Sequence, residues 1–114
     1  MLHEWDFRGC TTGVAVADTY WPSMALVATP YNDPTCSRTG IKFDGVSQFA
    51  QITSYSWGGS TSIEVYVMFG ALSGVSKVFD FGSGAQSDNL HLFWSGSVPQ
   101  LIGNSQLLRI LCKF

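Results

Sequence analysis

The acidic residues and histidines of this sequence are of the types that perform acid–base or nucleophilic catalysis. Their spacing, however, does not form a catalytic site. A retaining glycosidase holds two carboxylates about 5 to 5.5 Å apart. On a strand they would occupy alternating positions, because residues i and i+2 share a face. Glu64 is followed at those positions by Tyr66 and Met68. His3 and His91 have no Ser or Cys beside them in a strained turn, and no Gly-x-Ser-x-Gly motif is present. The sequence therefore predicts a protein that is not an enzyme.

The three cysteines could form a disulfide. In an oxidising compartment Cys10 and Cys36 are expected to pair, because each lies beside a turn rich in Thr or Pro. The alternative is three free thiols in a reducing compartment. Cys112 is left over in either case. A zinc site is not expected, since no two cysteines are close in the sequence.

Three aspartates are candidate ligands of calcium, the one cofactor that the sequence suggests. Asp44, Asp80 and Asp88 each lie at or near the end of an expected strand, and calcium takes carboxylate and carbonyl oxygens from loops. Asp44 has a simpler alternative role as a turn former before Gly45, with its side chain bonded to the local backbone.

Side chains on the outer faces of two expected strands could form a ligand-binding patch. If Ile63, Val65 and Val67 face a core, Glu64 and Tyr66 face outward. The same alternation on a nearby strand turns three more side chains outward. The predicted ligand-binding residues are Glu64, Tyr66, Asn89, His91 and Phe93. The alternatives are an ordinary sheet surface, or a contact with a sheet that lies outside this sequence.

The elements that would position these residues are strands. Twelve glycines, sixteen aromatic residues and short apolar alternations between turn residues are typical of an all-β sandwich. Residues 19–39 contain three prolines and are expected to form a long loop, with at most a short strand at 24–28. Residues 107–114 form either a terminal strand or the ill-fitting end of a truncated chain. The expected strands cover residues 4–8, a hairpin over 41–52, then 63–69, 77–81, 90–94 and 98–102.

Composition limits the partners. The 114 residues suffice for one domain, and only 12% are charged, with a net charge of −2. The six basic residues are scattered, so nucleic acid is not an expected partner. No apolar run is long enough to span a bilayer, so membrane insertion is not expected. Charged residues directly after Met1 do not form a secretory signal peptide.

Several motifs, taken in order, resemble the laminin G-like members of the concanavalin A-like lectin/glucanase superfamily. Residues 40–52 resemble the Gly-x-x-Phe-Asp-Gly hairpin of that family, and residues 61–67 its next strand. Residues 78–82 and 88–92 match two further strands in order and spacing, and residues 5–7 fit the opening strand. The resemblance covers about residues 4–94 of the chain and leaves 95–114 as an unassigned tail.

The resemblance implies an antiparallel two-sheet jelly-roll sandwich. Members of the family mostly bind sugars, glycosaminoglycans or protein receptors, and many hold calcium at the rim. Two departures bear on a ligand site. Ser47 and Gln48 replace the acidic residue that often precedes the aromatic, and the sequence stops before the strands that complete the second sheet.

The expectation from sequence is therefore a non-catalytic binding module of lectin-like or adhesion type, with a glycan or an extracellular protein as its partner. It is expected to be extracellular or at the cell surface, as a single laminin G-like domain (1–114) within a larger secreted protein, with a truncated C-terminus. The alternatives are a fragment of a glycoside hydrolase on the same fold and a purely structural interaction domain.

Overall fold

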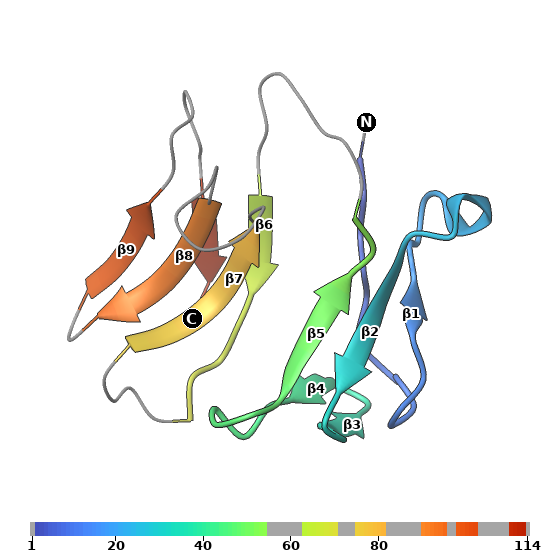
Figure 1. The fold of residues 1–114 in the computed structure, drawn as a ribbon, viewed down its shortest axis with the longest axis horizontal. Helices are drawn as coiled ribbons and strands as arrows, with labels where there is room; N and C mark the ends of the chain where they lie inside the picture. Colours follow the sequence, from blue (N-terminus) through green and yellow to red (C-terminus); the bar gives the residue numbers. More distant parts are fainter. Residues whose placement is uncertain are drawn as a thin grey trace. The chain divides into compact units, whose positions relative to one another are not determined.

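The computed structural model describes residues 2–54, 63–70, 75–81, 90–95, 98–102 and 110–113 (Figure 1). Nearly every element in these residues is a β-strand, which confirms the all-β prediction. The chain divides into two compact units, Met1–Trp57 and Gly58–Phe114. The single-domain expectation stays a prediction, and the two units are described in turn. The described residues contain no helix that is long and apolar enough to cross a membrane.

Unit 1 contains two small antiparallel sheets. The larger sheet has the order β1-β2-β5, and the smaller pairs β3 with β4. A short 3₁₀ helix, η1, lies between β1 and β2 (Figure 1). The elements are β1 (Val16–Ala17), η1 (Pro22–Met24), β2 (Val27–Tyr31), β3 (Thr35–Ser37), β4 (Gly40–Lys42) and β5 (Phe49–Ile52).

The centre of the larger sheet shows the period-two burial of a strand with one covered face. In β2 the side chains of Ala28 and Pro30 are buried, whereas Tyr31 is exposed. Leu26, just before the strand, is only 6% exposed. Pro30 is tolerated in this central strand because the ladder with β1 pairs only residues 27 and 28 of β2 and ends before it.

A disulfide joins the N-terminal segment to the smaller sheet. Cys10 and Cys36 are bonded, with their Cα atoms 5.4 Å apart, a normal spacing for a disulfide. Nearby, the amide of Gly9 donates a hydrogen bond of 2.9 Å to the carbonyl of Ser37. The predicted pairing of these two cysteines is confirmed.

The turn before β5 is organised by Asp44. Its Oδ1 atom accepts hydrogen bonds from the amides of Val46 (2.8 Å), Ser47 (3.0 Å) and Gln48 (3.1 Å). These bonds hold the pKa of the Asp44 carboxyl below its ordinary value. Gly45 follows with a φ of +72°, which glycine adopts without steric cost. The interpretation of Asp44 as a turn former is confirmed.

Three local predictions in unit 1 are wrong. Residues 4–8 form no strand, because this segment is held by isolated bonds such as that from the Thr19 amide to the Glu4 carbonyl (2.8 Å). The two arms of the expected hairpin over 41–52 do not pair, since β4 pairs with β3, and β5 pairs with β2. The expected long loop over 19–39, with at most a short strand at 24–28, contains all of β2 and all of β3.

Unit 2 contains a three-stranded meander and a separate strand pair. The meander has the strand order β7-β8-β9, and its neighbouring strands are antiparallel. The register between β7 and β8 shifts between Lys77 and Phe79. Leu92 on β8 is only 3% exposed, as its predicted inward orientation requires. The strands are β6 (Ile63–Tyr66), β7 (Val75–Phe81), β8 (Leu90–Ser95), β9 (Val98–Ile102) and β10 (Ile110–Lys113).

The β6 and β10 strands run parallel, with Ile110 opposite Ile63 and Lys113 opposite Tyr66. The expectation of antiparallel pairing throughout is therefore wrong for this pair. A parallel pair needs a long connection, which the segment containing β7, β8 and β9 supplies. Of the two alternatives for residues 107–114, a terminal strand is observed for Ile110–Lys113, the part of this segment that the structure describes.

Candidate ligand-binding face

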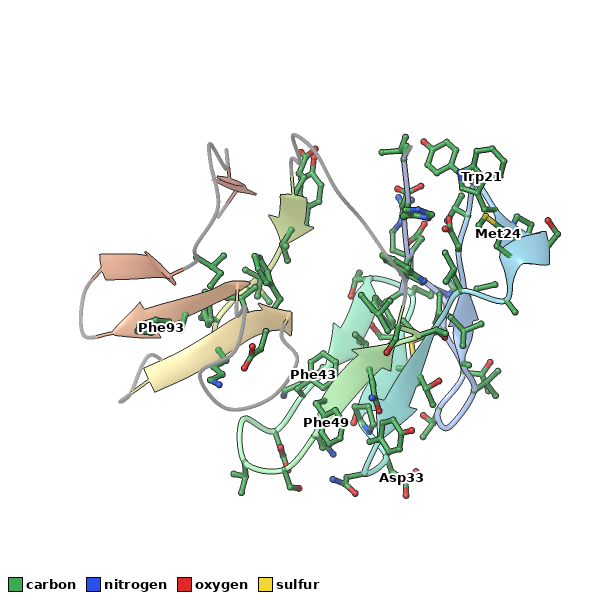
Figure 2. All side chains as sticks on the ribbon, turned by 45° about the horizontal axis from the view of Figure 1, so that its top comes forward. Trp21, Met24, Asp33, Phe43, Phe49 and Phe93 are labelled. Carbon is green, nitrogen blue, oxygen red and sulfur yellow. A yellow bond between two sulfur atoms is a disulfide. The ribbon has the colours of Figure 1, made fainter. Side chains whose placement is uncertain are left out.

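Two aromatic rings stack on the outer face of the β2–β5 pair. Tyr31 ends β2, Phe49 begins β5, and the strand register places them directly opposite each other. Their ring centroids are 4.9 Å apart and their planes differ by 12°, within the range of favourable stacked pairs. Tyr31 is 41% exposed and Phe49, which is labelled in Figure 2, is 49% exposed, so both residues are open to solvent. An exposed pair of this kind can stack against the C–H face of a sugar ring.

A shallow pocket of about 140 Å³ adjoins the ring pair. Pockets that enclose a drug-sized ligand have volumes of roughly 300 to 1,000 Å³. This pocket is therefore large enough for only part of a ligand, and the remainder must lie on the open surface beside it. Its lining residues come from β2, β5 and the two residues after β5, and are Thr29, Tyr31, Gln51, Ile52, Thr53 and Ser54.

Several polar groups around the pocket have unused hydrogen-bonding capacity. The side chains of Thr29, Gln51 and Ser54 and the hydroxyl of Tyr31 make no hydrogen bond with any other residue that the structure describes. Thr53 differs, because its hydroxyl accepts from the amide of Val27 (3.2 Å) and donates to the carbonyl of the same residue (3.2 Å). The free amide of Gln51 offers two donors and one acceptor. The site thus combines an aromatic surface with uncommitted neutral polar groups.

Two turns bonded to each other hold the aromatic pair in place. The Nε2 atom of Gln48 donates to the carbonyls of Asn32 (3.0 Å) and Asp33 (3.2 Å). The Nδ2 atom of Asn32 donates in return to the carbonyl of Ser47 (2.7 Å). Asn32 and Asp33 have φ angles of +62° and +52°, a conformation that Asn and Asp adopt more readily than other side chains. Because these turns directly follow Tyr31 and precede Phe49, they fix the ends of both strands.

Replacing Gln48 by alanine is expected to destabilise unit 1 by about 1 kcal/mol. The substitution removes the donor to Asn32 and Asp33 and also the Oε1 acceptor of the Asp44 amide (2.8 Å). Urea unfolding followed by tryptophan fluorescence measures the change. Gln51→Ala is the matched control, because the Gln51 side chain bonds to no residue that the structure describes. Equal unfolding midpoints for the two variants would contradict the bracing role of Gln48.

A buried aspartate that the sequence did not single out anchors the N-terminal segment. The side chain of Asp18 is fully buried, and its Oδ2 atom lies 2.5 Å from Nδ1 of His3. Its Oδ1 atom accepts from the amides of Tyr20 (2.9 Å), Trp21 (3.3 Å) and Glu4 (3.4 Å). Because these donors form hydrogen bonds with both oxygens of the carboxylate, Asp18 joins the N-terminal segment to the turn before η1 and has a structural role.

The pKa of Asp18 lies below its ordinary value. Burial alone raises it, but the hydrogen bonds from His3 and the three amides outweigh burial and favour the ionised carboxylate. The acid is therefore ionised at neutral pH.

Glu64 and Tyr66 lie on one face of β6, as predicted. Glu64 is exposed and Tyr66 is 71% exposed, whereas Val65 between them is partly buried. The Tyr66 hydroxyl donates a hydrogen bond of 2.5 Å to Glu64 Oε1, and this bond raises the pKa of the phenol. This bond uses the single donor of the pair, the phenol proton, and leaves mainly acceptor positions on the carboxylate for a ligand.

The other predicted ligand-binding residues belong to a different sheet or fall outside the description. Phe93 lies on β8, in the β7-β8-β9 sheet, and is partly buried. The backbone of His91 lies in the same strand, but its side chain is outside the described residues, and so is all of Asn89. The predicted patch is thus divided between the sheet of β6 and that of β8, and its ligand role stays a prediction.

The described residues do not test whether the three predicted calcium ligands come together. Asp44 lies in unit 1 with its Oδ1 atom bonded to three amides, and Asp80 in unit 2 is paired with Lys77 at 2.9 Å. Asp88 lies outside the described residues. Within the described part of the chain, no three His, Cys, Asp or Glu side chains form a group that could hold a metal ion. The calcium site stays a prediction.

Comparison of the chain with models of protein families, with curated proteins and with solved structures finds no match.

Proposed function

We propose that this protein is a non-catalytic binding module that recognises a glycan through the β2–β5 face. The observation that carries the proposal is the exposed Tyr31–Phe49 stack beside unbonded polar side chains. Sugars present apolar C–H faces and many hydroxyl groups, so they match this combination of an aromatic surface and neutral donors and acceptors.

The disulfide and the all-β architecture agree with an adhesion or lectin-like role outside the cell. The Cys10–Cys36 disulfide fits an oxidising compartment. The all-β architecture agrees with the laminin G-like jelly-roll fold that the sequence motifs suggest. An experimental structure in which the sheets do not pack face to face as a sandwich would contradict this assignment.

The proposal predicts that Tyr31→Ala and Phe49→Ala each weaken glycan binding about tenfold, because each removes one ring from the stack. The measurement starts from an array of immobilised neutral and acidic glycans, and titration calorimetry then compares the variants on the glycans that bind. Tyr20→Ala is the matched control, since Tyr20 is 53% exposed but belongs to the turn before η1.

Two outcomes would overturn parts of this proposal. If the folded protein binds no glycan on the array, the glycan function is wrong. If a glycan binds but Tyr31→Ala and Phe49→Ala bind as well as Tyr20→Ala, the β2–β5 face is not the site.

A protein partner is the second candidate, because another exposed apolar surface lies around η1. Trp21 and Met24 are at the end of unit 1 remote from Phe49 and Asp33 (Figure 2). A protein ligand on this surface would lose affinity with Tyr20→Ala and retain it with Tyr31→Ala, the reverse of the glycan result. The exposed residues of this surface are Leu2 (60%), Tyr20 (53%), Trp21 (43%) and Met24 (48%).

A further inference from the structure

The outer face of the β2–β5 pair is arranged in successive rows along the strands. The first row is Tyr31 opposite Phe49, and the next row on the same face is Thr29 opposite Gln51. Two residues of a strand advance about 6.6 Å, so the polar row begins roughly one ring width from the aromatic row. A ligand that uses both rows must extend along the strands and not across them.

Beyond the second row the face continues to the end of the pocket. Thr53 donates its amide to the carbonyl of Val27 (2.9 Å), and Ser54, whose hydroxyl bonds to no residue that the structure describes, completes the lining. From Phe49 to Thr53 the strand advances about 13 Å. This length exceeds one sugar ring, so the face has room for a chain of linked rings.

Among the described residues that line the pocket, the only ionisable group is the phenol of Tyr31. Acidic residues stand in the two turns that support the ring pair, namely Asp33 and Asp44. The hydrogen bonds that Asp44 accepts favour its ionised form. An anionic ligand would meet these carboxylates without a cation in the lining to compensate.

The basic residues of unit 1 do not offset these negative charges at the pocket. Arg8 is paired with Asp6 (2.6 Å), Lys42 lies on β4, and Arg38 lies between β3 and β4. None of the three lines the pocket. Residues 1–57 contain these three basic residues and five acidic ones (Glu4, Asp6, Asp18, Asp33 and Asp44), a formal charge of 3 − 5 = −2.

We infer that the ligand of this face is an uncharged oligosaccharide that lies along the strands. One ring stacks against the Tyr31–Phe49 pair, and the next bonds to Gln51, Thr29 and Ser54 in the pocket. The inference rests on the proposed glycan-binding function and narrows it, because it excludes sulfated and uronic-acid polymers as the preferred ligands.

The test compares neutral and anionic probes on the intact chain by titration calorimetry. The neutral probes are the monosaccharide, disaccharide and tetrasaccharide of the cello-, manno- and galacto-series, and the anionic probes are heparin and polygalacturonate. We expect at least one neutral tetrasaccharide to bind more tightly than its monosaccharide. Its affinity is expected to be equal at low and high salt, because no ionic contact is made.

Single substitutions test which row of the face contacts which ring of the ligand. Gln51→Ala is expected to reduce tetrasaccharide affinity about fivefold, since it removes hydrogen bonds in the pocket. It should change monosaccharide affinity much less, because a single ring occupies the aromatic row. Tyr20→Ala is again the control and should leave every affinity unchanged.

The outcomes separate this inference from the function on which it rests. Tighter binding of heparin or polygalacturonate, declining with salt and lost in Phe49→Ala, would overturn the uncharged ligand and leave glycan binding intact. Equal affinities for the monosaccharide and the tetrasaccharide would overturn the arrangement along the strands. Absence of binding to every glycan, neutral or anionic, would overturn the proposed function itself.

Discussion

Loss of the Cys10–Cys36 disulfide is expected to lower the free energy of unfolding of unit 1 by about 3.5 kcal/mol. The bond closes a loop with a sequence separation of 26 residues, and the unfolded chain gains the corresponding conformational freedom when the bond is absent. The effect is large, because small domains have total stabilities of only about 5 to 15 kcal/mol.

Guanidinium unfolding of the double variant Cys10→Ala, Cys36→Ala measures this difference. Both the double variant and the reference protein should carry Cys112→Ala, so that the third thiol cannot exchange with the disulfide. A reductant should lower the midpoint of the reference protein and leave that of the double variant unchanged. Equal midpoints with and without reductant in the reference protein would show that the bond contributes no stability.

Replacing Asp18 by alanine is expected to destabilise the protein by about 3 kcal/mol, because it removes a buried carboxylate that accepts several hydrogen bonds, and each hydrogen bond to a charged group contributes about 1.5 to 3 kcal/mol. The amides of Tyr20 and Trp21 and the ring of His3 lose this acceptor. Asp18→Asn keeps an acceptor oxygen and is expected to cost about 1 to 2 kcal/mol. Asp6→Ala is the control, because Asp6 accepts from Arg8 in a solvent-exposed pair and should have little effect.

The same residue gives the stability a defined dependence on pH. The folded pKa of Asp18 lies below its ordinary value of 3.8. Its contribution is therefore fully present above about pH 4 and is lost as the pH falls through the lower, folded pKa. Thermal unfolding measured across the acid range should show a steeper loss of stability in the parent protein than in Asp18→Asn. Parallel pH profiles would contradict this assignment.

The strands of unit 2 could be predicted from the sequence because their partners are neighbours in the chain. β9 coincides with the predicted strand over residues 98–102, and β8 extends the predicted strand over 90–94 by one residue. The alternation around Val65 and the inward position of Leu92 follow from the same period of two. The parallel partner of β6 could not be predicted in this way, because no local pattern specifies pairing between distant strands.

Unit 1 was harder to predict because its pairing is non-local and its turns contain unusual residues. Pro30 and Pro34 favour a loop, yet Pro30 lies in β2 at a position beyond the ladder with β1. Tyr31 and Phe49 are distant in sequence, so their contact appears only when β2 is paired with β5. One local sequence pattern could have indicated the end of β2. Residues 27–31 end in a tyrosine directly before the turn residues Asn32 and Asp33.

Asp18 could not have been identified by type or spacing. An aspartate between Ala17 and Thr19 resembles many exposed loop residues, and its acceptor role depends on the return of the N-terminal segment to the same place. Buried acids of this kind are specified by tertiary packing, which a single sequence does not reveal.

The parallel pairing of β6 with β10 also affects the order in which parts of the chain can fold during synthesis on the ribosome. Every ladder of unit 1 is complete once residue 52 has been synthesised, and its disulfide needs only residues 10 and 36. In contrast, the backbone of β6 must await Ile110 to Lys113 before this ladder can form. The first unit can therefore fold and form its disulfide before the β6–β10 ladder of the second unit is complete.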